Sequence, residues 1–227
     1  MKKTKTEIEK DVLQVDDMYK HYAVGLTFVD KFLGGVPKDP EIIRAWLNSE
    51  ATRKKLERKG LTVADVLPEV MTATEVLSDQ EEAAWSGFRK DAEGIYIAAH
   101  QIPAMLHDAA NLLQLHKEVQ GLKNTLTRGV YVRPDHVHFK DKPMPDGSEE
   151  WGARVQGIRG PRSILQKHDY VENAEVEFTV SVIDNGKLSE KNLRRMFYVS
   201  QEMGMGAARP RGYGKFKVTE FGETDEK

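Results

Sequence analysis

The feature of this sequence that most limits its fold is the order of strand-like and helix-like segments after residue 95. The segment 174–184, AEVEFTVSVID, alternates between apolar and polar residues, which predicts a strand with one buried face. The segment 103–121 carries a broad apolar stripe at helical spacing between Pro103 and Gly121, which predicts a helix. By the same criteria we expect strands at 95–101, 129–139, 152–160 and 213–221, a loop at 140–150, and a helix at 188–204.

This order predicts an α+β protein with a ferredoxin-like core. The part of the chain from residue 95 onward contains the order β-α-β-β-α-β, which is the split β-α-β arrangement of ferredoxin-like folds. A further strand is expected earlier, at 21–33, because this segment is rich in β-branched and aromatic residues and ends at Gly34 and Gly35.

The region 37–94 separates that early strand from the rest and is expected to be mostly helical. It begins with Asp39 and Pro40, a suitable N-cap and first helical residue, and Ser78 followed by Glu81 forms a later capping pattern. The helical stretches are expected at 37–60, 61–77 and 78–94. The segments expected to lie outside the folded core are the polar residues 1–20 and the tail 222–227.

Composition excludes several classes of protein. The chain has 227 residues, of which 39% are hydrophobic and 31% charged, as in an ordinary globular protein. It has no cysteine, which excludes disulfides and cysteine-ligated zinc and fits a cytoplasmic location. It has no apolar run long enough to span a membrane, and its first residues lack the apolar region of a secretory signal. We therefore expect a cytoplasmic protein without a membrane partner.

The distribution of charge is more informative than the net charge of −2. Residues 62–98 carry eight acidic and two basic side chains, whereas residues 187–217 carry eight basic and two acidic side chains. A surface that binds a polyanion can therefore be present in a protein whose total charge is close to zero.

The basic segment contains a glycine-rich loop, GMGAARPRGYGK, at residues 204–215. Glycines permit positive φ angles and let a ligand approach the backbone closely. Arginine and lysine side chains pair with phosphates, and a tyrosine ring offers a face on which a base can stack. The loop lacks the GK[ST] and GxGxxG patterns of mononucleotide and dinucleotide sites. The candidate binding residues are Gly204, Gly206, Arg209, Arg211, Gly212, Tyr213, Gly214 and Lys215. The alternative is a structural turn that needs positive φ angles alone.

A second group of glycines and cations occupies residues 157–168, GIRGPRSILQKH. Arg159, Arg162 and Lys167 would contact a nucleic-acid backbone if this segment were a basic loop between strands. The alternative is a solvated connector without a ligand.

The histidines are the candidates for chemistry. His100, His107 and His116 bracket the helix at 103–121. His107 lies beside Asp108, and the two could polarise a ribose hydroxyl, with the histidine as general acid or base. The alternative is a histidine that makes a local hydrogen bond. His136 and His138 share one face of a strand, but no third ligand lies at a metal-binding spacing. We therefore expect no metal and no cofactor.

The stretch 203–221 resembles the C-terminal glycine-rich signature of the RAMP superfamily, the RNA-binding backbone and processing subunits of CRISPR effector complexes. A weaker resemblance covers 97–113, where His100-Gln101-Ile102-Pro103 stand in place of the serines and lysine of that family. Residues 21–36 resemble the opening strand of phage and prophage proteins with the same ending. The residues that match the glycine-rich signature are Gly204, Gly206, Arg209, Gly212, Gly214 and Phe216.

The resemblance implies an RRM-related, ferredoxin-like core made of residues 21–36 and 95–221, with 37–94 as a helical insertion. It also implies single-stranded nucleic acid lying across the sheet, with the glycine-rich loop touching the sugar-phosphate backbone. Such proteins assemble head-to-tail along the strand, so we expect a homo-oligomer or a larger ribonucleoprotein.

Three functions follow as hypotheses. The first is a protein that binds single-stranded RNA or DNA without cleaving it. The second is a metal-independent endoribonuclease of the same superfamily that uses His100 or His107. The third is a protein-interaction module that mimics or inhibits a CRISPR complex through its acidic insertion.

Overall fold

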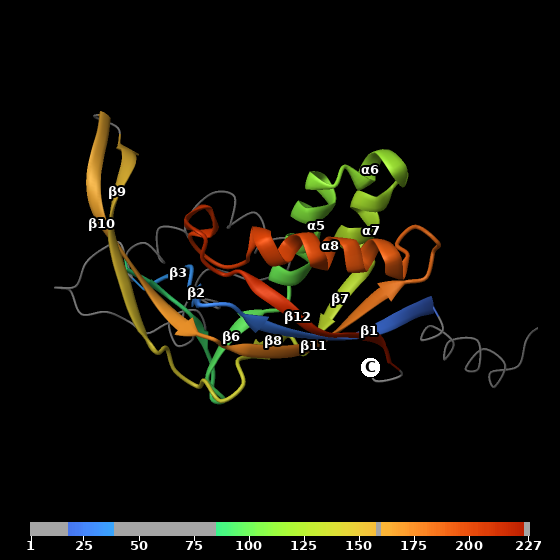
Figure 1. Ribbon diagram of the computed structural model, residues 1–227, viewed down its shortest axis with the longest axis horizontal. Helices are drawn as coiled ribbons and strands as arrows, with labels where there is room; N and C mark the ends of the chain where they lie inside the picture. Colours follow the sequence, from blue (N-terminus) through green and yellow to red (C-terminus); the bar gives the residue numbers. More distant parts are fainter. Residues whose placement is uncertain (1–17, 39–84, 158–159, 225–227) are drawn as a thin grey trace, which may run out of the picture.

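The computed structural model describes residues 18–38, 85–157 and 160–224. Its centre is a four-stranded antiparallel sheet in the order β12-β1-β11-β7. The strands are β1 (Tyr19–Phe28), β7 (Val130–Arg133), β11 (Glu175–Ile183) and β12 (Phe216–Glu223). One face of this sheet is covered by helices (Figure 1).

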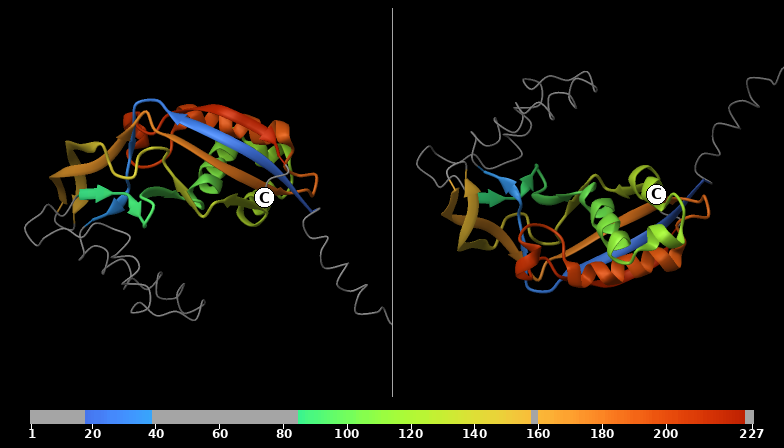
Figure 2. Two further views of the ribbon diagram at one scale, coloured as in Figure 1. Left: turned by 90° about the horizontal axis from the view of Figure 1, so that it is seen from below. Right: turned by 90° about the horizontal axis from the view of Figure 1, so that it is seen from above.

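Two groups of helices make up this covering layer, and both lie on the same side of the sheet in all views (Figure 2). The helices are α5 (Gln101–Leu112), α6 (Leu115–Glu118), α7 (Leu122–Arg128) and α8 (Glu190–Met203). The first three lie between β1 and β7 in the chain, and α8 lies between β11 and β12. This chain order and this strand order are those of the ferredoxin-like fold, so the predicted α+β class is confirmed.

The first strand of the core is β1, which overlaps the segment 21–36 that the resemblance implied as the opening strand, and it differs from the strand expected from segment order alone. The segment 95–101 was expected to open the β-α-β-β-α-β unit, but β1 takes that place in the sheet. The expected segment instead forms β6 (Ile95–Ala98), which pairs with β5 (Arg89–Lys90) and β8 (His136–His138) in a separate sheet. The local sequence of an apolar strand does not indicate which sheet it joins, because sheet membership depends on pairing with distant strands.

The alternation of β1 and β11 explains why the sheet buries one face. Tyr22, Val24, Leu26 and Phe28 of β1 are each at most 3% exposed, whereas the residues between them are mostly less buried. The predicted strand at 174–184 behaves in the same way, with its apolar residues turned toward the helices. The buried residues of β11 in this layer are Val176, Phe178, Val180 and Val182.

The predicted helix at 103–121 is interrupted. It ends at Leu112, and Gln114 adopts a left-handed conformation with φ 54° before the short helix α6. Gly121, expected as the stop, has φ 80° and precedes α7, which the sequence analysis did not predict. The break turns the chain so that Leu115 and Leu122, both at most 1% exposed, reach the core.

The predicted start and stop of α8 are confirmed. The Ser189 side chain caps the helix by accepting a hydrogen bond from the Asn192 backbone N–H, at 3.3 Å. Gly204 is the C-terminal cap, with φ 67°. Among the described residues no helix is long and apolar enough to cross a membrane.

A second sheet carries a long hairpin that projects from the body of the molecule (Figure 1). Its strands are β2 (Lys31–Leu33), β3 (Val36–Pro37), β4 (Trp85–Gly87), β9 (Gly147–Gly157) and β10 (Gly160–Glu172). The hairpin is β9 and β10, paired from Gly147↔Tyr170 to Gly157↔Gly160.

The hairpin corrects two predictions. The loop expected at 140–150 gives way to β9 from Gly147 onward, and the basic loop expected within 157–168 is mainly the strand β10. The reason is the continuous antiparallel ladder, whose main-chain hydrogen bonds outweigh the local turn preference of glycine and proline.

The end of the expected helical region is also strand. Residues 85–87 and 89–90 form β4 and β5, where a helix was expected over 78–94, because β4 pairs with β3 and with β10. The expected helices at 37–60 and 61–77 fall almost entirely outside the described residues, as do most of the segment 1–20 and the end of the tail. The boundaries of the insertion therefore stay a prediction.

The two ends of that region are joined at Asp169. The Lys38 backbone N–H donates to the Trp85 carbonyl at 2.9 Å, and Lys38 Nζ lies 2.7 Å from Asp169 Oδ2. The Trp85 indole N–H donates to Asp169 Oδ1 at 2.7 Å. Since the Lys38 and Asp169 side chains are only 6% and 5% exposed, this is a buried ion pair with an additional hydrogen bond.

Candidate nucleic-acid interface

The glycine-rich loop connects α8 to β12 and is hydrogen-bonded to the strand β2. The Ala207 backbone N–H donates to the Leu33 carbonyl at 3.1 Å, and the Gly214 N–H donates to the Lys31 carbonyl at 2.9 Å. Residues Arg209–Arg211 form a single 3₁₀ turn within the loop. The loop is thus held in place by main-chain hydrogen bonds to the second sheet.

Three glycines of the loop stand where the main chain packs too closely to admit a side chain, either within the loop or against β2. A Cβ on Gly214 would lie 1.8 Å from the Met205 carbonyl oxygen, and one on Gly204 would lie 2.7 Å from the Tyr213 carbonyl oxygen. A Cβ on Gly206 would lie 2.9 Å from the Leu33 carbonyl oxygen. Gly212 is different, because no described atom lies within 4 Å of its Cβ position. Of these four candidate residues, Gly212 alone has open space beside its α-carbon.

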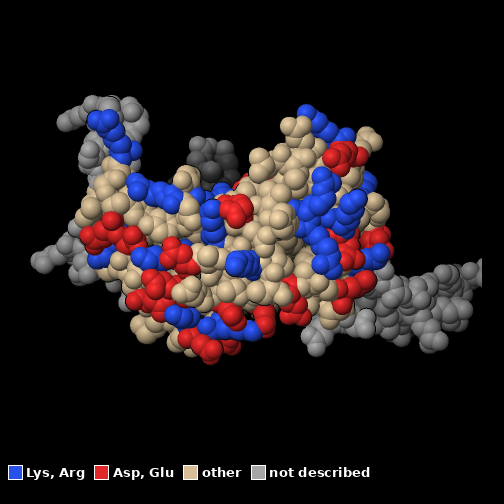
Figure 3. Space-filling model, in the orientation of Figure 1, with Lys and Arg blue, Asp and Glu red and all other residues tan. Residues whose placement is uncertain are grey.

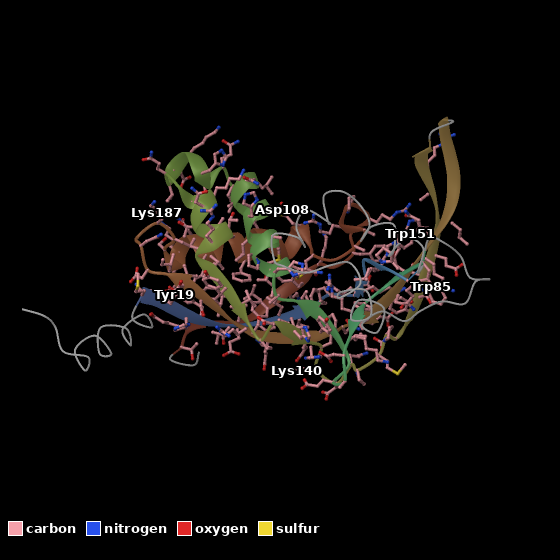
Figure 4. All side chains as sticks on the ribbon, turned by 180° about the vertical axis from the view of Figure 1, so that it is seen from behind. Tyr19, Trp85, Asp108, Lys140, Trp151 and Lys187 are labelled. Carbon is pink, nitrogen blue, oxygen red and sulfur yellow. The ribbon has the colours of Figure 1, made fainter. Side chains whose placement is uncertain are left out.

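The loop meets the base of the hairpin at Trp151. The Trp151 ring stacks on His168 with centroids 4.9 Å apart and planes 3° apart, and on Tyr213 at 5.9 Å and 16°. The Arg211 guanidinium lies 4.8 Å from the Trp151 ring centroid. Figure 4 shows Trp151 at the foot of the hairpin, close to Trp85. Trp151 and His168 were not among the predicted binding residues, and no local sequence signal pointed to them.

Tyr213 is anchored by Glu149 rather than free. Its hydroxyl donates to Glu149 Oε1 at 3.1 Å, and Lys31 Nζ donates to Glu149 Oε2 at 2.5 Å. The hydrogen bond from Lys31 and that from Tyr213 lower the pKa of Glu149. Burial and the hydrogen bond to Glu149 raise the pKa of Tyr213, so the phenol remains a neutral donor. The ring of Tyr213 is therefore fixed beside Trp151.

Most of the predicted cations are matched by carboxylates from other elements. Arg209 Nη1 lies 3.1 Å from Asp108 Oδ2, and both side chains are partly exposed. Lys215 Nζ lies 2.7 Å from Glu202 Oε2. Such exposed pairs contribute about 0–1 kcal/mol to stability, so a phosphate can replace the carboxylate. In the described part of the chain Arg211 has no acidic partner.

The cations of the hairpin are arranged along its two strands. Lys167 Nζ lies 3.1 Å from Glu150 Oε1 and 4.0 Å from the centroid of the Trp85 ring. Arg162 belongs to β10, where its backbone pairs with Val155, and Arg159 lies outside the described residues. Arg154 of β9 is exposed and was not predicted. The space-filling view shows basic side chains on part of the hairpin (Figure 3).

The candidate catalytic histidines are placed on α5 and at its start. His100 is the N-cap residue of α5, without a side-chain hydrogen bond to the cap. His107 Nδ1 lies 3.2 Å from the side-chain amide of Asn111, four residues later on the same helix. Its neighbour Asp108 is the residue that binds Arg209. Catalysis by these histidines stays a prediction.

The pair His136 and His138 binds a carboxylate. His136 Nδ1 lies 2.7 Å from Asp91 Oδ2, and His138 Nε2 lies 2.9 Å from Asp91 Oδ1. Burial acts to raise the pKa of Asp91, but the hydrogen bonds from the two histidines outweigh it and lower this pKa to about 2. Among the described residues no three histidine, aspartate or glutamate side chains are grouped so that they could hold a metal ion.

Comparisons with known proteins support the fold. No protein-family model matches the sequence, and no curated protein matches it. Among solved structures, the chain is similar to a chain in the cryo-EM structure of the Type III-B Cmr-beta complex bound to cognate target RNA, with a TM-score of 0.50 and 14% sequence identity. The match covers 98% of this chain and 68% of that chain. At this identity the shared property is the fold.

Proposed function

We propose that this protein binds single-stranded nucleic acid, RNA rather than DNA, where the glycine-rich loop meets the base of the β9–β10 hairpin. The observation that carries this proposal is Arg211, a cation without an acidic partner in the described part of the chain, which lies 4.8 Å from the ring of Trp151. The RNA-bound complex that contains the fold neighbour supports the choice of RNA. The resemblance of residues 203–221 to the RAMP signature supports it independently.

Binding would combine phosphate contacts with stacking. Arg211 offers a phosphate contact without first giving up an ion pair, whereas Arg209 and Lys215 would exchange Asp108 and Glu202 for phosphates. A base stacks on an aromatic or guanidinium plane in a way that does not depend on sequence, and each such contact is worth about 1–3 kcal/mol. The guanidinium plane of Arg211, held beside the Trp151 ring, provides such a surface.

Assembly along the strand is part of the same proposal. The RAMP-like signature supports head-to-tail association of several copies on one nucleic acid, as in CRISPR effector complexes. A second copy of this chain would then extend the interface beyond one molecule.

The test is a titration of labelled single-stranded RNA and DNA of the same sequence, followed by fluorescence anisotropy at two salt concentrations. Arg211→Ala is expected to weaken binding about tenfold and to reduce the slope of log K against log salt by about 1. Lys20→Ala is the matched control, because Lys20 is an exposed lysine at the far end of β1 that pairs with Asp184 at 3.3 Å. Equal effects of the two substitutions would refute the proposed site, and tighter binding of DNA would refute the choice of RNA.

A further inference from the structure

The free side of β12 carries a groove that the proposed nucleic-acid interface does not use. β12 is the edge strand of the four-stranded sheet, paired with β1 on one side, and α8 runs beside it on the other. The groove between them has a volume of about 780 Å³. Residues that line it include Arg194, Arg195, Tyr198, Gln201, Val218 and Phe221.

The main chain of this edge is already occupied by side chains from α8. The Val218 backbone N–H donates to Gln201 Oε1 at 2.8 Å, and Arg194 Nη2 donates to the Phe221 carbonyl at 3.1 Å. The ladder with β1 also shifts register between Gly25 and Leu26, which marks a bulge in the pairing. Capped main-chain groups and a bulge both disfavour the addition of another strand. An occupant of the groove must therefore bind through its side chains.

The walls of the groove are apolar and aromatic. Tyr198 is 73% exposed, which is unusual for so large a side chain on a helix that packs against the core. Leu113, Val199, Val218 and Phe221 provide further apolar lining. An apolar or aromatic side chain of a partner would be removed from water here, at about 25 cal/mol for each Å² buried.

The charged side chains at the groove are mainly basic. Arg194 and Arg195 line it together with one acid, Glu220. Arg194 Nε lies 2.8 Å from Glu190, and Arg195 Nη1 lies 3.5 Å from Glu118. These exposed pairs are weak, so carboxylates of a partner can share or replace them. In the space-filling view, basic side chains gather over the region of α8 (Figure 3).

We propose that the groove between α8 and β12 is a docking site for an acidic peptide segment of a partner protein, with an apolar or aromatic anchor between carboxylates. The anchor packs on the exposed ring of Tyr198, and the carboxylates face Arg195 and Arg194, whose guanidinium lies 4.4 Å from the centroid of the Phe221 ring. A peptide fits better than a nucleic acid, because the lining beside the arginines is mainly apolar and both arginines already have a carboxylate partner.

The absence of cysteine from the chain allows a direct test by disulfide exchange. Val199→Cys places the sole thiol on a partly exposed residue of α8 that lines the groove, and Glu175→Cys on β11 places it outside the groove as the matched control. Each protein is equilibrated in a fixed excess of β-mercaptoethanol with synthetic peptides that hold a tryptophan and flanking glutamates and whose cysteine is supplied as its mixed disulfide with β-mercaptoethanol. The protein thiolate attacks this disulfide and releases β-mercaptoethanol. The bound fraction, measured by mass spectrometry, reports the non-covalent preference of the site.

The acidic peptide is expected to be captured by Val199→Cys about fivefold more than peptides with alanine for tryptophan or lysine for glutamate, because each loses a contact of about 1 kcal/mol. Glu175→Cys is expected to show no preference. Adding Arg195→Glu to Val199→Cys is expected to reverse the preference toward the lysine peptide. Equal capture of all peptides, stronger capture of a thiol-bearing single-stranded RNA, or disulfide-linked dimers of the protein in place of peptide capture would each overturn the proposal.

Discussion

Gly214→Ala tests whether the glycine-rich loop is built for its own packing. Gly214 has φ 73°, a left-handed conformation in which alanine costs about 1–2 kcal/mol. Its new Cβ would stand 1.8 Å from the Met205 carbonyl oxygen, a distance that no side-chain motion can relieve because both atoms belong to the main chain or are bonded to it. The backbone of the loop must therefore move.

That movement has a cost that the structure allows us to work out. The Met205 N–H donates to the Gly214 carbonyl at 3.0 Å, and the Gly214 N–H donates to the Lys31 carbonyl at 2.9 Å. Each lost hydrogen bond removes about 1 kcal/mol. Together with the conformational cost, Gly214→Ala is expected to lower the free energy of unfolding by about 3–4 kcal/mol.

Gly212→Ala provides the matched control. Gly212 has φ 93°, so alanine meets a comparable conformational cost, but no described atom lies within 4 Å of the new Cβ. The free energy of unfolding of Gly212→Ala is expected to be about 1–2 kcal/mol lower than that of wild type. Urea denaturation followed by circular dichroism measures both values. Equal losses for the two variants, or a loss below about 1 kcal/mol for Gly214→Ala, would refute the argument from close packing.

Two further predictions concern charged groups. Asp169→Asn removes the carboxylate that lies 2.7 Å from the buried Lys38 ammonium, so the free energy of unfolding in urea is expected to fall by about 3 kcal/mol; a loss below about 1 kcal/mol would contradict a buried ion pair. The histidine partners of Asp91 lower its pKa to about 2, so its ionised form stabilises the folded protein. Near pH 6 the free energy of unfolding of wild type is therefore expected to exceed that of Asp91→Asn by about 1 kcal/mol, a value reduced because the side chains are partly exposed. This advantage is present above the ordinary pKa of about 4 and is lost as the pH falls toward 2, so a gap that stays constant between pH 6 and 2.5 would be the contrary result.

The elements with strong local patterns were predictable. The alternation in 174–184 predicted β11 and its buried face, and Ser189 and Gly204 marked the two ends of α8. Such features depend on residues within a few positions of one another, since the period of a strand and the capping of a helix are local properties. The same holds for the positive φ angles at the glycines of the loop.

Elements without a distinctive local pattern were not predictable. The helix from residue 101 stops at Leu112 because the next leucines must reach the core, although Gln114 itself gives no stop signal. Trp85 belongs to a strand because it pairs with Lys167 in β10, in a segment that carries a helix-capping pattern a few residues earlier. In each case a contact with a distant segment overrides the local preference.

The sequence by itself determined the class of fold and the place of the glycine-rich loop, because hydrophobic period, helix caps and glycine spacing are properties of neighbouring residues. Only the tertiary structure decided which cations of that loop are paired. Arg209 meets Asp108, which lies 101 positions away, and Tyr213 meets Glu149, whereas Arg211 meets the ring of Trp151. These contacts depend on the pairing of the hairpin and the packing of α5, which bring together segments that are far apart in the sequence. The position of a charged residue in the sequence therefore does not predict which charged residue it contacts in the folded protein.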